Sequence, residues 1–243
     1  MYDFIEAKPS ENIINRYLLF CLFELFKIKF PKDYLELIIS IVKNSKIFIF
    51  EKGIIKIEEN AFYNCDNLTE VIIPNSVTDI GRGSFWNCAS LNNIIIPNSV
   101  TNIGRASFWH CISLTNIVIP DSVTSIGVSA FIYCENLTSI VIPNSVTNIE
   151  INSFYMCKSL TSVIIPDSVI SIGKEAFEYC KSLTKVIIPD SITNIGYCAF
   201  YNCNSLTEII IPDSVIDKGK FCFPKHTKII LNKSSQKNNF YTN

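Results

Sequence analysis

The sequence has little net charge and very little histidine, and these two scarcities exclude several classes of function. Its 243 residues carry 21 basic and 22 acidic side chains, a net charge of −1. No positive potential therefore draws the chain to nucleic acid or to anionic membranes. The two histidines, His110 and His226, are accompanied by no glycine-rich phosphate loop and no nucleophile elbow. We expect no nucleic-acid partner, no catalytic residue and no enzymatic activity.

Long apolar runs and the pattern of an export signal are also missing. The apolar stretch from Tyr17 to Phe26 is interrupted by Glu24 and is shorter than the about 20 residues that a membrane span needs. Acidic residues precede this stretch and no small-residue cleavage site follows it, unlike a secretory signal. We expect no membrane insertion and a cytoplasmic location. The cell surface is the alternative, with Asn-x-Ser/Thr triplets at Asn67, Asn136 and Asn232 in its favour.

Cysteine, in contrast, is plentiful, with ten residues in the chain. Seven of them recur at a fixed interval and so form one column of a repeat. If the copies stack as neighbouring strands, successive cysteines of this column lie about 4.8 Å apart, within reach of a disulfide, so spacing alone leaves bonding open. An odd number in one column favours reduced, buried thiols that act as small hydrophobes. No CxxC pair or Cys/His cluster has zinc-ligand spacing, so we expect neither metal nor cofactor. Seven of the ten recur every 23 residues, as Cys65, Cys88, Cys111, Cys134, Cys157, Cys180 and Cys203.

The period of 23 residues extends to most other positions of the sequence. Columns of leucine and proline keep the same step, starting from Leu68 and Pro74. Seven copies this regular predict a solenoid, in which each unit buries its apolar side against its neighbours. The phenylalanine column consists of Phe62, Phe85, Phe108, Phe131, Phe154, Phe177 and Phe200.

Within one copy the pattern predicts two short strands and a corner. Residues 70–73 alternate as a strand with Ile72 pointing outward, and residues 77–80 alternate as a second strand after a polar turn. Gly81 permits a tight corner, and residues 82–87 are expected to form a helical turn.

The two ends of the chain depart from the repeat. Residues 1–45 carry apolar side chains at three- and four-residue spacing and are expected to form a helical N-terminal cap. The array then covers residues 46–231, with worn copies at both ends. Residues 232–243 are polar and expected to be disordered.

The repeated unit resembles a known family. The unit AFxxCxxLTxVxIPxSVTxIG, read here as AFEYCKSLTKVIIPDSITNIG from Ala176 to Gly196, resembles the BspA-like leucine-rich repeat proteins. The resemblance implies a leucine-rich-repeat solenoid of mostly short parallel β-strands with helical turns, which the N-terminal helical segment would cap. It also implies binding of proteins or cell surfaces, without shared catalytic residues; several members are surface adhesins.

Two sets of residues are candidate binding positions. Trp86 and Trp109, which follow the repeated phenylalanine, are candidate contacts because aromatic residues are enriched at interfaces. The alternative, which we favour, is that these rings pack on one another and on the corners of the coils. The outward strand position is aliphatic in every copy, which favours an exposed binding stripe or simply a stable parallel ladder. This column consists of Ile72, Ile95, Val118, Val141, Ile164, Ile187 and Ile210.

We therefore predict a monomeric, non-enzymatic scaffold that binds a protein partner through its repeats. A cell-surface adhesin of the BspA-like type is one alternative. The other is a substrate receptor of a ubiquitin ligase, since residues 30–42, FPKDYLELIISIV, faintly resemble the start of an F-box.

Overall fold

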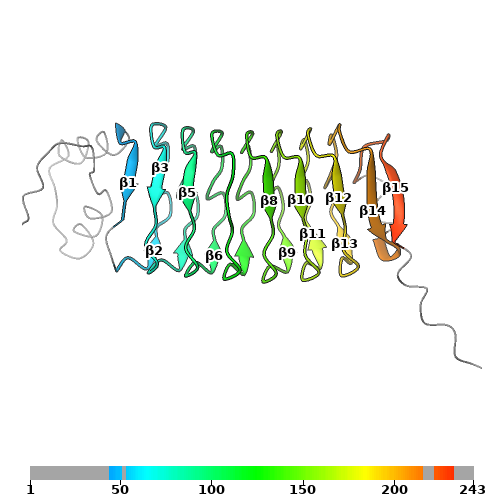
Figure 1. Ribbon diagram of the computed structural model, residues 1–243, viewed down its shortest axis with the longest axis horizontal. Helices are drawn as coiled ribbons and strands as arrows, with labels where there is room; N and C mark the ends of the chain where they lie inside the picture. The colour runs from blue at the N-terminus through cyan, green and yellow to red at the C-terminus, as the bar shows by residue number, and fades with distance from the viewer. Residues whose placement is uncertain (1–43, 51–52, 216–221, 233–243) are drawn as a thin grey trace, which may run out of the picture.

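The computed structural model describes residues 44–50, 53–215 and 222–232. In this part the chain winds into a parallel β-solenoid whose coils stack one beside the next along the long axis (Figure 1). The leucine-rich-repeat solenoid predicted from the sequence is confirmed. The helical cap predicted for residues 1–45 and the tail predicted for residues 232–243 lie outside the described residues, except for Asn44, Ser45 and Asn232.

One side of every coil contributes to a ladder of parallel strands, here called the broad ladder. The register is in step with the repeat, since Ile72 pairs with Ile95 and Ile187 pairs with Ile210. Residues 116–118 form no strand, which divides the ladder into two sheets. The strands are β1 (Ile47–Ile49), β3 (Glu70–Ile72), β5 (Asn93–Ile95), β8 (Ser139–Val141), β10 (Ser162–Ile164), β12 (Lys185–Ile187), β14 (Glu208–Pro212) and β15 (Lys228–Asn232).

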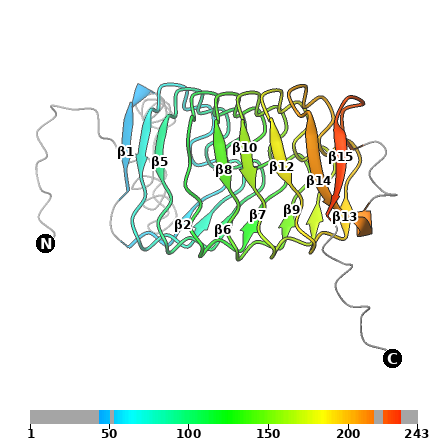
Figure 2. The same ribbon diagram turned by 45° about the vertical axis from the view of Figure 1, so that its right-hand side comes forward.

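A second side carries two-residue strands that form the narrow ladder, visible behind the first when the molecule is turned (Figure 2). It is also divided once, between β7 and β9. The strands are β2 (Lys56–Ile57), β4 (Asp79–Ile80), β6 (Asn102–Ile103), β7 (Ser125–Ile126), β9 (Asn148–Ile149), β11 (Ser171–Ile172) and β13 (Asn194–Ile195).

The glycine that follows each narrow strand is required by close stacking and not by its backbone angle. A Cβ atom on Gly104 would lie 2.7 Å from backbone atoms of Gly81 and Ile80 in the preceding coil, and one on Gly127 would lie 2.5 Å from the amide of Arg105. Glu150 occupies this position where the narrow ladder is divided. A Cβ atom at this step would approach the preceding coil closely in the glycine copies, and the break between β7 and β9 coincides with the copy that has a side chain there.

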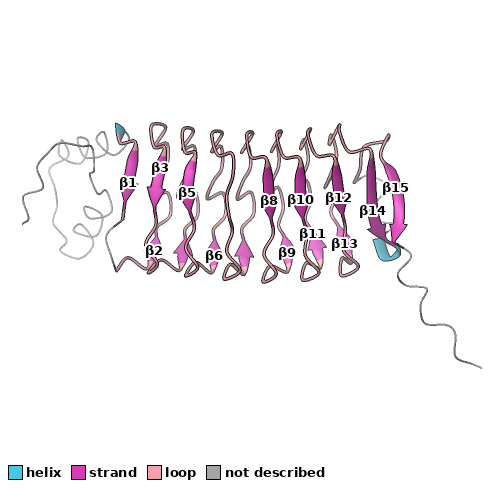
Figure 3. Cartoon of the chain, viewed as in Figure 1, coloured by secondary structure: helices cyan, strands magenta, loops and turns pink. Residues whose placement is uncertain are grey.

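The third side is built of turns, so the prediction of a helical turn at residues 82–87 is wrong. Figure 3 shows loops between the strands here. Gly83 and Asn87 have positive φ angles of 56° and 55°. The residues between them alternate: Trp86 N–H donates to the Gly83 carbonyl in its own turn, whereas Phe85 N–H donates to Ser107 in the next coil. In a helix the amides would donate hydrogen bonds within their own turn, whereas here about half of them donate to carbonyls of the neighbouring coil.

The constant columns of the repeat fill the core. Phe131 is fully buried, and its ring stacks on those of Phe108 and Phe154 at 5.2 and 5.5 Å between centroids, nearly parallel in both cases. The same contact recurs along the array, so one column of rings runs through its centre. The leucines at this step of the repeat, such as Leu114 and Leu137, are buried around the rings.

The cysteine column links consecutive coils. The thiol of Cys88 donates to the Phe62 carbonyl oxygen at 3.1 Å, and that oxygen also accepts the amide of Cys65 at 3.2 Å. The thiols of the following copies repeat this bond. The nine described cysteines are free thiols, as expected. The six of the column from Cys88 to Cys203 are more than small hydrophobes, because each thiol gives a second hydrogen bond to a buried carbonyl of the preceding coil.

Candidate functional site: the outer face of the broad ladder

The outward column of the broad ladder forms a continuous apolar stripe, here called the aliphatic ridge. Ile95 and Val118 are 73% and 72% exposed, and Val141 and Ile164 are exposed too. Ile210 is the exception, because it is only partly exposed on β14. The structure therefore places these predicted binding residues on one face. The ridge consists of Ile72, Ile95, Val118, Val141, Ile164, Ile187 and Ile210.

Strand formation alone does not account for the ridge. The narrow ladder pairs in the same parallel manner, yet the outward residue of its strands is Asp, Asn or Ser in β4, β6, β7, β9, β11 and β13. Some of these polar side chains bond across coils, as Asn102 does to Asp79 at 3.0 Å. A ladder of this fold thus forms with polar outward residues. The aliphatic character of the ridge is a property of one face and is not needed to build the fold.

The two candidate tryptophans lie away from the ridge, on the side made of turns. Trp86 and Trp109 are partly buried and stack on each other, with ring centroids 4.4 Å apart and planes 7° apart. Each is also in contact with a tyrosine ring, Tyr63 for Trp86 and Tyr133 for Trp109. The rings therefore pack against one another, and their role in partner binding stays a prediction.

This stacking continues along the array as an aromatic band that column analysis of the sequence missed. Ile132 and Glu178 occupy the tryptophan column but are buried, so that column looks interrupted. In those two coils the next residue, Tyr133 or Tyr179, supplies the ring instead. Both tyrosines have positive φ, as the residue at this step does in the other coils, and their rings contact rings of neighbouring coils. The band consists of Tyr63, Trp86, Trp109, Tyr133, Tyr155 and Tyr179.

Within residues 44–50, 53–215 and 222–232, the titratable side chains form no recognisable chemical centre. His110 contacts the Asn87 side chain and the Tyr133 ring. Burial, and next the Glu175 carboxylate, raise the pKa of Glu178, while Lys174 opposes them. Burial raises the pKa of the Cys134 thiol to about 12, which makes it a poor nucleophile. Among the described residues no group of three or more His, Cys, Asp or Glu side chains could hold a metal ion.

The described part of the chain likewise contains no helix with the length and apolar character that crossing a membrane requires.

Comparison with known proteins agrees with the repeat and the solenoid. The pattern of the BspA type leucine rich repeat region matches residues 40–161 and 147–242. The chain therefore belongs to the family of BspA type leucine-rich repeat proteins. Among curated proteins, none matches the sequence.

Two solved structures are similar in fold. A leucine-rich repeat protein from Bacteroides ovatus is 28% identical, with a TM-score of 0.63, over 78% of this chain and 54% of that protein. A leucine-rich repeat protein from T. pallidum is 29% identical, also with a TM-score of 0.63, over 76% of this chain and 87% of that protein. The chain thus spans about half the length of the Bacteroides protein.

Proposed function

We propose that the protein is a non-enzymatic scaffold that binds a protein partner through the aliphatic ridge. The observation that carries the proposal is the contrast between the two ladders. One of the two outward columns of the broad ladder is aliphatic, the ridge itself, whereas the outward column of the narrow ladder is polar. An exposed apolar patch of this extent gains free energy when a partner covers it, at about 25 cal/mol per Å² of apolar area.

The dimensions of the ridge suit a protein partner. Seven positions at a strand spacing of about 4.8 Å extend over about 29 Å. One side of a standard interface covers about 800 Å², roughly a square of that width. Polar side chains border the ridge, such as Asn93, which donates to Glu70 at 2.9 Å. An apolar centre with a polar rim is the usual arrangement of such interfaces.

Site-specific photo-crosslinking tests this proposal. A benzophenone amino acid replaces Ile95 or Val141 on the ridge, and Ile170 serves as the control. Ile170 is a matched position because it is an exposed isoleucine, 49% accessible, beside the narrow ladder. We expect both ridge positions to form a covalent adduct with the same protein in cells, and Ile170 to form none. Adducts of equal yield at all three positions would refute binding through the ridge.

The place where the protein acts is part of the same proposal. A scaffold in the cytoplasm and an adhesin at the cell surface would use the same ridge. Labelling of intact cells with a membrane-impermeant reagent separates them, because only a surface protein is modified. The F-box alternative depends on residues 30–42, outside the described residues, and co-purification with a Skp-type adaptor tests it.

A further inference from the structure

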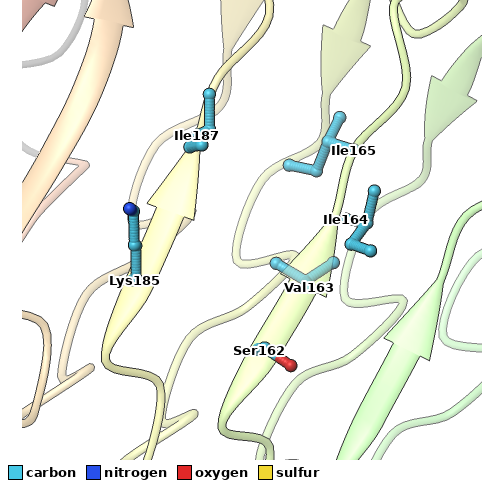
Figure 4. Close-up of a pocket in the computed structure, with 6 residues that line it drawn as sticks. All are labelled: Ser162, Val163, Ile164, Ile165, Lys185 and Ile187. Atoms are coloured by element: carbon cyan, nitrogen blue, oxygen red, sulfur yellow. The ribbon is translucent and has the colours of Figure 1, made fainter.

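A groove opens in the broad ladder between β10 and β12. The two strands share one register pair, Ser162 with Lys185, whereas three pairs join β10 to β8 and three join β12 to β14. Beyond the shared pair no further register pair joins the two strands, and a half-open groove of about 420 Å³ lies over them (Figure 4). It is lined by Ser162, Val163, Ile164, Ile165, Lys185 and Ile187.

The groove is apolar along most of its length. Ile164 and Ile187 belong to the aliphatic ridge and border it from the two strands, while Val163 and Ile165 belong to the core. Ile165 is 8% exposed, much like Ile73 and Ile119 at the same step in other coils, and it forms part of the groove floor. An aliphatic side chain of a ligand would therefore be surrounded by aliphatic side chains.

The polar end of the groove is positive. In the column of residues that pair across the ladder, Lys185 lies between Ser162 on β10 and Glu208 on β14. Within the described residues Lys185 forms no ion pair. Glu208 in turn lies between Lys185 and Lys228 in the ladder, so these three residues together carry a net charge of +1. A carboxylate on the ligand would complement this end.

We propose that this groove binds an extended peptide segment of the partner with an acidic residue two positions from an aliphatic one. The proposal rests on the proposed function, since the groove would be one contact site for the partner on the outer face of the broad ladder. Lys185 and Ile187 are two residues apart on one strand and face the same way. Residues two apart in an extended peptide are separated by the same distance, about 6.6 Å. The acid then meets Lys185 while the aliphatic side chain enters between Ile164 and Ile187.

Selection from a display library of random dodecapeptides on the full chain tests the groove. We expect enrichment of peptides with Asp or Glu two positions from Leu, Ile or Val. The best peptide, labelled with fluorescein, is then titrated by anisotropy. We expect Lys185→Glu to weaken binding at least tenfold and Ile187→Ser at least fivefold, with Lys185→Arg within about threefold of the unchanged chain. Ile95→Ser, on the same ridge but outside the groove, should leave the affinity unchanged.

The outcomes separate this inference from the proposed function. Selected peptides without an acidic residue, or full binding by Lys185→Glu, would refute the proposal that the groove binds such a peptide. So would a selection that enriches no peptide. In each of these cases the proposed function stands if photo-crosslinks still form at Ile95 and Val141, and it fails only if they do not. Unchanged circular dichroism of Lys185→Glu confirms that a loss of affinity is not a loss of fold.

Discussion

Replacing Phe131 by alanine tests whether the stacked rings hold the array together. Phe131 is fully buried between two parallel rings in the middle of the column. Truncating such a residue removes its burial and leaves a cavity, which together destabilise a protein by about 3 to 5 kcal/mol. In a solenoid each coil contacts only its neighbours, so the loss also weakens the coupling between the coils on either side.

Urea unfolding measures this effect. With a slope of about 3 kcal/mol per molar urea, a loss of about 4 kcal/mol lowers the midpoint by about 1.3 M. Far-UV circular dichroism follows the whole array, and tryptophan fluorescence follows its N-terminal part, since both tryptophans precede Phe131. Val141→Ala is the matched control, because Val141 lies in the same copy of the repeat but is 56% exposed. We expect it to change stability by less than about 0.5 kcal/mol. Equal midpoints for the two variants would refute the role of the ring column.

Three further predictions concern other residues. Because Glu178 has a raised pKa, its contribution to stability is present below its ordinary pKa and is lost as the pH rises through the raised value. Glu178→Gln should therefore raise the unfolding midpoint at pH 7 and leave it unchanged below about pH 4. An unchanged midpoint at pH 7 would contradict this. At pH 8 iodoacetamide should modify the partly exposed Cys198 well before the fully buried Cys134 in the folded protein, as peptide mass spectrometry can measure; equal rates would contradict the buried thiol column. The double change of Trp86 and Trp109 to alanine should weaken partner capture and keep the far-UV circular dichroism of the fold, and a loss of that signal would show that the band is structural instead.

Much of the fold can be predicted from the sequence because the repeat averages out local ambiguity. Alternation within one strand is weak, but seven copies agree that Val71 and its equivalents face inward and that Ile72 and its equivalents face outward. The aliphatic ridge follows from that alternation alone. The free thiols also follow, since a column of seven cysteines does not pair evenly.

The conformation of the turns at residues 82–87 could not be predicted, because their positive φ angles do not fall on the repeated glycine, such as Gly81. The repeated glycine suggested a tight corner, yet the positive φ angles occur at other steps of the repeat, including Asn64, His110 and Glu175. Side chains as different as these adopt this conformation because the hydrogen bonds between coils impose it. A signal was nevertheless present, since asparagine tolerates this conformation and recurs at Asn64 and Asn87.

The aromatic band and the groove depend on contacts between coils, which no single column describes. The band passes from one column to the next at Tyr133 and returns at Tyr155. The groove lies where β10 and β12 share a single register pair, although both strands have the ordinary pattern of the repeat. Such features depend on small shifts between neighbouring copies that are nearly identical in sequence.

The central claim is that the constant columns build the array and the aliphatic ridge binds the partner. The double variant Ile95→Ser with Val141→Ser tests it most directly, with Ile170→Ser as the control, by measuring both the unfolding midpoint and capture of the protein that crosslinks at Ile95. Because both ridge side chains are more than half exposed, we expect each substitution to change stability by less than about 1 kcal/mol. Capture should be lost in the ridge variant and retained in the control. Full capture by a folded ridge variant would contradict the claim.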